Sequence, residues 1–158
     1  MGHPVGDVTV EVSDTTGLAG LCRDAGVDVL DLAAEWRACD REPEEILAGA
    51  GVSLPRFCDT APEGWTRLER VSERVLTPLG DRFPQARLGF RAGRLHAVGY
   101  YRGISFNVDA ELGGAGYSVA DGGTVDWTQR LLSDRRERLL TSGIGTERVA
   151  RLLAGPVS

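Results

Sequence analysis

The sequence predicts an α+β domain in which an antiparallel β-sheet is flanked by helices. The first half holds segments with helical spacing that end at glycine or proline, and the second half holds short alternating segments joined by glycine-rich turns. A last apolar segment returns to helical spacing. At 158 residues the chain has the length of one domain. We expect residues 1–158 to form it, with a strand and mainly helical part over 6–80 and a sheet with a closing helix over 81–158.

The first half begins with a strand. Val8, Val10 and Val12 alternate with polar residues and are expected to face the core. Helices are predicted over 15–25, after the capping residues Ser13–Thr16, over 29–38, from Glu42 with Pro43 in the first turn, and over 65–79. The helical residues expected to face the core are Leu18, Leu21, Cys22, Leu30, Ala33, Ala34, Trp36, Leu68, Val71, Val75 and Leu76.

The second half predicts strands at 86–90, 94–98, 103–111 and 116–120, joined as an antiparallel meander. Its most informative stretch is 98–109, where Tyr100 and Tyr101 stand at a glycine-flanked bend. A strand-like alternation follows, with Ile104, Phe106 and Val108 on one face and Ser105, Asn107 and Asp109 on the other. A helix over 125–132, a strand over 139–142 and a helix over 146–153 complete the chain. The charged run 130–138 is most simply a solvated helix face or turn.

Composition narrows the classes of function. The net charge of -5 and pI near 5.1 argue against a nucleic-acid binder that relies on bulk charge, although a local basic stripe is compatible with them. No apolar run reaches the roughly 18 residues of a membrane span, and the start lacks the pattern of a signal peptide, so the cytoplasm is expected. The three cysteines, Cys22, Cys39 and Cys58, are expected to be reduced, small buried residues.

Three local features bear on chemistry. Gly143–Arg148 can bring backbone amides to an anion at a helix N-terminus, with Arg148 binding a phosphate or carboxylate. The alternative is a glycine-rich turn with Arg148 paired to an acid. Gly122-Gly123 is either a tight turn or part of a site. His96 is most simply a satisfied structural residue, and with His3 as the only other histidine a histidine-based metal site is not expected.

The same residues carry a resemblance to a family. The stretch 99–106 resembles the Tyr-Tyr-Thr-Gly-x-Val-Phe-Glu signature of histidyl-tRNA synthetase and of its inert paralogue, the regulatory subunit of ATP phosphoribosyltransferase. The stretch 122–126 resembles the family's Gly-Gly-Arg-Tyr-Asp, and 143–148 resembles motif 3 of class II synthetases, in the same order. The resemblance covers about residues 6 to 154. It implies a partial class II catalytic domain and a candidate cofactor, ATP with magnesium. The ligand-binding residues that it implies are Tyr100, Tyr101, Gly122, Gly123, Gly143, Gly145 and Arg148.

The departures from the family shape the functional hypothesis. His96 stands at the position of the family's catalytic arginine, and Arg94 is two residues off register. Thr124, Val125 and Asn107 replace an arginine, a tyrosine and a glutamate of the signatures, and motifs 1 and 2 have no counterpart. We therefore expect a paralogue that is inactive alone and binds an amino-acid-like or nucleotide ligand. A protein partner, either another chain or a second copy, would cover the open sheet edge and apolar face that half a domain leaves.

Two alternatives remain at this stage. The chain could be a regulatory subunit of a phosphoribosyltransferase-type enzyme. It could also be half of an ATP-dependent amino-acid-adenylating ligase that acts outside translation. The acidic charge and the absence of an anticodon-binding domain argue against tRNA as a partner.

Overall fold

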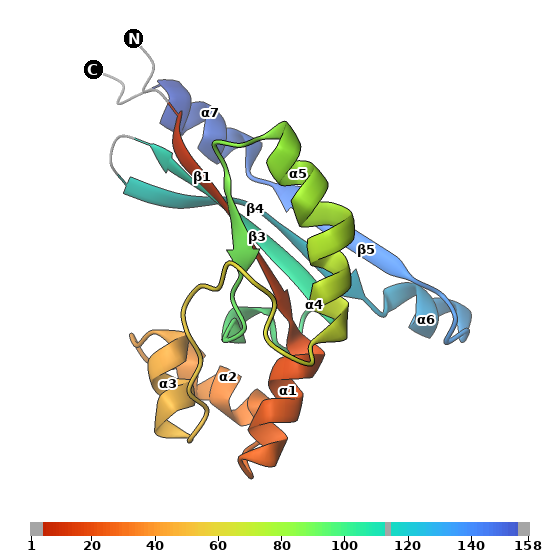
Figure 1. Ribbon diagram of the computed structural model, residues 1–158. Coiled ribbons are helices and arrows are strands. Elements are labelled where there is room, and N and C mark those ends of the chain that lie inside the picture. Colours follow the sequence, from red (N-terminus) through yellow and green to blue (C-terminus); the bar gives the residue numbers. More distant parts are fainter. Residues whose placement is uncertain (1–4, 113–114, 155–158) are drawn as a thin grey trace.

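A computed structural model describes residues 5–112 and 115–154 of the chain and confirms the α+β class. A five-stranded sheet with the order β2-β1-β3-β4-β5 carries the helices (Figure 1). Its strands are β1 (Val5–Asp14), β2 (Arg87–Phe90), β3 (Ile104–Leu112), β4 (Ala115–Val125) and β5 (Leu139–Ile144).

The expected antiparallel meander is wrong for the first of its strands. β2 pairs in parallel with β1, whereas the β1–β3, β3–β4 and β4–β5 pairs are antiparallel. Parallel neighbours need a long crossover connection, and the helices between β1 and β2 supply it. The sheet is therefore mixed, with one parallel pair at the β2 edge.

The helices form two groups, which Figure 1 separates clearly. Three short helices gather at one end of β1, and a longer helical run lies along the sheet. The helical elements are α1 (Thr15–Asp24), α2 (Val29–Arg37), α3 (Pro43–Gly49), α4 (Thr66–Val71), the π-helical turn η1 (Ser72–Leu76), α5 (Thr77–Arg82), the 3-10 turn η2 (Leu95–Ala97), α6 (Trp127–Leu132) and α7 (Thr146–Ala154). As expected from the sequence, Asp14 caps α1, where its Oδ1 accepts a hydrogen bond from the Thr16 amide at 2.9 Å.

The predicted helix over 65–79 is continuous but not regular. The Thr77 amide donates to the Ser72 carbonyl, five residues back, just before Pro78, which has no amide hydrogen to donate. This π turn shifts the phase of the helix. Leu68 and Leu76 are buried as expected, but Val75, which was expected to face the core, is 51% exposed.

The core-facing positions of α2 also differ from the prediction. Leu32 and Ala33 are buried, whereas Leu30 and Ala34 lie on the exposed side. The buried stripe has the spacing i, i+3, i+4, i+7 when it is counted from Val29 rather than from Leu30.

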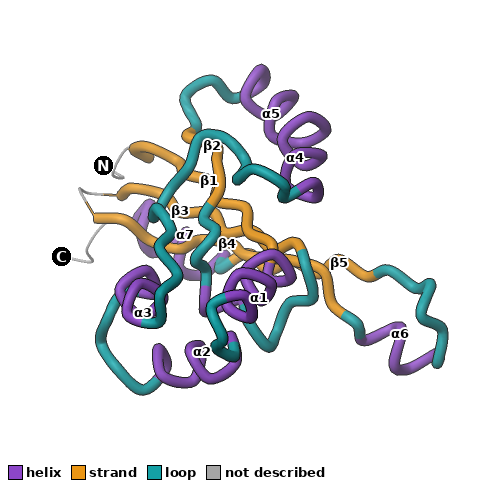
Figure 2. Tube along the Cα trace, turned by 60° about the horizontal axis from the view of Figure 1, so that its bottom comes forward, coloured by secondary structure: helices purple, strands orange, loops and turns teal. Residues whose placement is uncertain are grey.

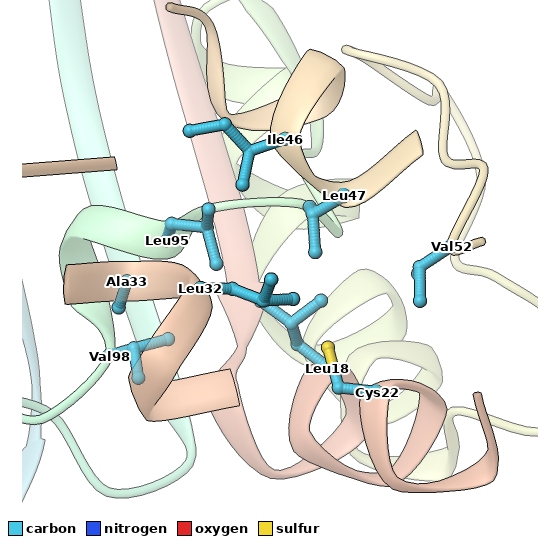
Figure 3. Packing of buried hydrophobic residues seen from close by; sticks show 9 residues of the cluster. All are labelled: Leu18, Cys22, Leu32, Ala33, Ile46, Leu47, Val52, Leu95 and Val98. Carbon is cyan, nitrogen blue, oxygen red and sulfur yellow. The ribbon is translucent and has the colours of Figure 1, made fainter. Parts of the chain in front are cut away.

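Three apolar clusters stabilise the described part of the fold, and the smallest consists of Ala97, Tyr101 and Val125. The first joins α1, α2 and α3 to the segment around η2 (Figure 3) and consists of Leu18, Cys22, Leu32, Ala33, Ile46, Leu47, Val52, Leu95 and Val98. The second lies between the helical run α4–η1 and strands β1 and β2, and consists of Val12, Leu68, Leu76 and Phe90. Of the three free cysteines only Cys22 is buried, so the expectation of burial is wrong for the exposed Cys39 and met only in part by Cys58.

The predicted strand over 94–98 is wrong. This segment turns through η2, where the Val98 amide donates to the Leu95 carbonyl at 3.0 Å. Leu95 and Val98 both enter the first apolar cluster, and a strand would place residues three apart on opposite sides. The bend that follows is the predicted one, because Gly99 and Gly103 have positive φ angles of 90° and 104°.

β3 has the predicted alternation, but its burial is the reverse of what an amphipathic surface strand suggests. Ser105 is fully buried and Asn107 is 8% exposed. The apolar side chains Ile104, Phe106 and Val108 on the opposite face are only half-buried. A face that looks solvent-exposed in the sequence is therefore covered in the structure.

The glycine pair of β4 lies inside the strand, so the tight-turn alternative for Gly122-Gly123 is wrong. A Cβ at Gly122 would stand 2.5 Å from the Phe106 ring, and one at Gly123 would stand 2.6 Å from the Tyr101 ring. Each glycine therefore makes room for an aromatic side chain, one on each face of the sheet.

Candidate functional site

A buried arginine lies on the polar face of the sheet. Arg94 is 1% exposed, and its NH2 atom donates to Oδ1 of Asn107 in β3 at 3.3 Å. Its Nε donates to Nε2 of His96. The remaining NH1 atom has no hydrogen-bond partner within the described part of the chain. Leaving a buried donor unpaired is costly, so this atom marks a place where a further acceptor would be stabilised.

Asn107 links the arginine to the neighbouring strands. Its Oδ1 also accepts a hydrogen bond from Ser118 Oγ of β4 at 2.9 Å. Its amide nitrogen donates to Oδ1 of Asp109 at 2.7 Å. The side chain is thus held in one orientation, with its oxygen toward Arg94.

The charges around Arg94 shift the pKa values of one another. Burial lowers the pKa of Arg94, and the nearby Asp121 and Glu11 oppose that effect. Burial also raises the pKa of Glu11, although Arg91 at 3.8 Å counteracts it. Arg91 is itself held by Glu44, whose Oε1 accepts from its Nε at 2.8 Å. The buried cluster therefore contains positive and negative charges that only partly neutralise one another.

His96 is electrically neutral in this environment. Burial, together with the positive charges of Arg94 and Arg91, lowers its pKa to about 3. A neutral ring fits its role as acceptor for Arg94. His96 lines a separate cavity of about 490 Å³ with Trp36 and Arg91. The buried cation of this segment is therefore Arg94, not His96.

A second group of candidate side chains lines a larger open cavity of about 730 Å³ between β4, β5 and α7. Its charged residues are Asp121, Glu147, Arg148 and Arg151, of which Glu147 and Arg151 form an ion pair, and Gly143 and Gly145 form part of its wall. NH1 of Arg148 donates to the Ser118 carbonyl at 3.0 Å, which fixes the direction of the guanidinium. Its other donors remain able to bind an anion. Below, this space is called the α7 cavity.

Tyr101 connects the α7 cavity to the buried cluster. Its hydroxyl donates to Oδ2 of Asp121 at 2.8 Å. Burial, and then this hydrogen bond, raise the pKa of Tyr101 to about 12. The hydroxyl therefore stays protonated at neutral pH and orients the Asp121 carboxylate.

The structure gathers some of the predicted ligand-binding residues and separates others. Gly143, Gly145 and Arg148 meet at the α7 cavity. Tyr101 reaches it only through Asp121. Tyr100 is 55% exposed and packs edge-on against Tyr101 and Trp127, with ring centroids 4.8 and 5.9 Å away. Gly122 and Gly123 lie beneath aromatic rings rather than in the cavity wall.

Sequence reasoning missed two residues of this site, Asp121 and Ser118. A signal was present for Asp121, because it directly precedes the Gly122-Gly123 pair. In the sheet it stands opposite Gly143 of β5. Ser118 gave no signal, since its role depends on the pairing of β3 with β4.

The chain is similar to proteins of known structure. No family model and no curated protein matches the chain. A chain of the ATP phosphoribosyl transferase (HisG:HisZ) complex from Thermotoga maritima matches at a TM-score of 0.44 and 16% identity, over 88% of this chain and 53% of that one. This protein thus spans about half the length of the chain it matches. The sequence resemblance named the regulatory subunit of the same enzyme, but a likeness of this degree does not establish a shared activity.

The described residues lack two other kinds of feature. No helix there has the length and apolar character needed to cross a membrane. In the same residues no group of three or more His, Cys, Asp or Glu side chains could hold a metal ion.

Proposed function

We propose that the chain is a binding subunit that takes a small amino-acid-like or nucleotide ligand in the α7 cavity and works with a protein partner. The observation that carries the proposal is the placement of Asp121 and Arg148 in one cavity. A carboxylate and a guanidinium that line one cavity suit a ligand that has both an ammonium group and an anionic group.

The surroundings of the two charges support the same reading. Tyr101 orients the Asp121 carboxylate, and the Ser118 carbonyl orients Arg148. Side chains held in this way lose little freedom when a ligand binds, which favours affinity. Gly143 offers space, because a Cβ there would meet nothing within 4 Å.

A protein partner is proposed because apolar side chains lie open near the β5 edge. Leu140 and Ile144 on β5 are 58% and 66% exposed, and Leu131 on α6 is 82% exposed. Among the described strands β5 pairs only with β4. An edge of this kind is a template for pairing with another chain.

The ligand is tested by calorimetric titration of the purified chain with each of the common amino acids and with ATP. We expect one class to bind, and Arg148→Gln or Asp121→Asn to weaken binding about tenfold or more. Arg130→Gln is the matched control, because Arg130 lies on α6, away from the cavity, and it should leave the affinity unchanged. Absence of heat with every ligand, or an equal loss in the control, would remove the proposal.

The alternative role as a regulatory subunit of a phosphoribosyltransferase-type enzyme is favoured by the neutral state of His96. Synthetase-like catalysis calls for a cation at that position. The histidine supplies none, and the guanidinium of Arg94, two residues off register, donates to Asn107 and His96 instead. Co-purification of a phosphoribosyltransferase whose rate changes on adding this chain would support this role. Amino-acid-dependent pyrophosphate exchange by the complex, lost in Arg148→Ala, would instead support an adenylating ligase with ATP and magnesium.

A further inference from the structure

A cleft rich in arginine lies at the opposite end of the β4–β5 pair from the α7 cavity. It has a volume of about 720 Å³. Its arginines come from α4, from the bend before β3 and from the loop between α6 and β5, and they are Arg67, Arg102, Arg135 and Arg138. Figure 2 shows α6 and its loop projecting from the sheet at this end, far from α7. We call this space the arginine cleft.

Two of these four side chains lie near acids: NH1 of Arg67 is 3.6 Å from Oδ1 of Asp14, and Arg102 pairs with Asp126. Asp126 is the acidic residue in the wall of the arginine cleft. It is shared, because its Oδ2 lies 3.4 Å from Nε of Arg102 and 2.9 Å from NH2 of Arg130. In a chain whose net charge is -5, this is a local excess of positive charge.

Two guanidinium groups of the cleft also donate to neutral acceptors. NH1 of Arg67 donates to Thr16 Oγ1 at 3.0 Å. NH1 of Arg138 donates to the carbonyls of Arg135 and Glu137, each at 2.9 Å. A guanidinium has five N–H donors, so these contacts fix the groups without saturating them.

The floor of the cleft leaves room for a ligand. Gly103 has a φ of 104°, and a Cβ there would approach Arg67 NH1 to 3.3 Å and Thr124 Oγ1 to 3.4 Å. The glycine is needed for the bend, and because it has no side chain it also leaves space beside Arg67. The volume lies within the range of ordinary small-molecule sites.

We propose that the arginine cleft binds a small ligand with several phosphate groups. A phosphate carries close to two negative charges near neutral pH, and guanidinium groups bind it bidentately. Four guanidinium groups around one concavity match several linked phosphates better than a single carboxylate. The cleft is formed by side chains far apart in the sequence, which distinguishes it from the solvated charged run that residues 130–138 suggested.

Inorganic triphosphate is the probe, titrated into the full chain by calorimetry at low salt. We expect it to bind, and the double variant Arg135→Gln, Arg138→Gln to weaken binding about a hundredfold, since each charged hydrogen-bond pair contributes roughly a factor of ten. Arg136→Gln is the matched control: this arginine is in the same loop but pairs with Asp134 at 3.2 Å. It should change the affinity less than about twofold.

The outcomes separate this proposal from the one for the α7 cavity. If Arg148→Gln abolishes triphosphate binding and the double variant does not, the phosphate site is the α7 cavity and the arginine cleft has no such role. Absence of binding, or equal weakening by Arg136→Gln, also overturns the proposal. Tighter binding of a single-stranded RNA than of triphosphate, with the same dependence on Arg135 and Arg138, would replace the small ligand by nucleic acid.

Discussion

The sheet has a β2–β1 side and a β4–β5 side, named after the strands at its two edges, and these sides differ in how well other segments cover them. On the β2–β1 side the helical run α4–η1 packs on the apolar face, where Val12 and Phe90 are buried. The polar face of the same side carries the buried guanidinium of Arg94. On the β4–β5 side Leu140 and Ile144 are exposed, and the α7 cavity and the arginine cleft open at its two ends. We call these the closed side and the open side.

This difference indicates that the two sides have different roles, one in folding stability and the other in binding. The closed side contains the second apolar cluster and is stable through its own packing. The open side has polar and charged concavities and an unpaired strand, so it gains most from contacts with other molecules. Substitutions should therefore change folding stability on the closed side, and binding on the open side.

The largest expected effect compares one leucine on each side. Leu68→Ala, on α4 and fully buried, should lower the free energy of unfolding by about 3 kcal/mol, because it leaves a cavity in a packed cluster. Leu140→Ala, on the exposed face of β5, should lower it by less than about 0.5 kcal/mol. Urea titrations followed by circular dichroism measure both. Similar losses of unfolding free energy in the two variants would contradict this difference between the closed and the open side.

An effect of intermediate size concerns acid stability on the closed side. The folded pKa of His96 is about 3, below the ordinary value of 6.5. Its contribution to stability is therefore present above pH 6.5 and is lost as the pH falls from 6.5 toward 3. The slope is at most about 1.4 kcal/mol per pH unit. We expect His96→Gln, which keeps an acceptor for Arg94, to flatten this dependence.

Unfolding free energies at pH 7.5 and pH 5, measured for the parent and for His96→Gln, test this effect. The raised pKa of Glu11 acts with the opposite sign, since it favours the folded state as the pH falls, but it is common to both proteins. Identical acid dependence in the two would show that His96 is not the group responsible.

A smaller effect, an increase in folding stability rather than a decrease, is expected when Arg94 is replaced. The guanidinium is buried with one nitrogen unpaired, so replacing it by an apolar side chain of similar length relieves a desolvation cost. We expect Arg94→Met to stabilise the isolated chain by about 1 kcal/mol, measured by urea unfolding. Arg91→Met is the control. It breaks the ion pair with Glu44 and should destabilise. Destabilisation by Arg94→Met would mean that the arginine is a structural residue only.

Much of the fold could be predicted from local sequence. Periodicity located β1, β3 and most helices, because these patterns reflect which face each element buries. It failed at η2, because the polar residues Arg94 and His96 alternate with apolar residues as they would in a strand. It also failed for the parallel position of β2, since strand order depends on long-range packing that no local pattern records.

The candidate site was predictable only in part. Gly143, Gly145 and Arg148 are neighbours in the sequence, so a motif could reveal them. The partnership of Asp121 with Tyr101 depends on the pairing of β3 with β4, and the environment of Asn107 depends on the segment that carries Arg94. Pairings of that kind appear only once the chain is folded.

The smallest expected change in stability lies at the β5 edge, where the effect on association should be largest. Leu140→Lys places a charge on an exposed edge strand, so it should change the unfolding free energy by less than about 0.5 kcal/mol. A lysine there opposes pairing with another strand. We therefore expect this variant to lose the association with a partner, or with a second copy, that the parent shows.

Leu30→Lys is the matched control, because Leu30 on α2 is 54% exposed, close to the 58% of Leu140, and lies away from β5. Sedimentation velocity over a range of concentrations, with pull-down from the source cells, measures association in all three proteins. If Leu30→Lys reduces association as much as Leu140→Lys, a general increase in charge explains the effect. Loss in Leu140→Lys alone assigns the contact to the edge strand, since the two substitutions change charge and exposed apolar area almost equally.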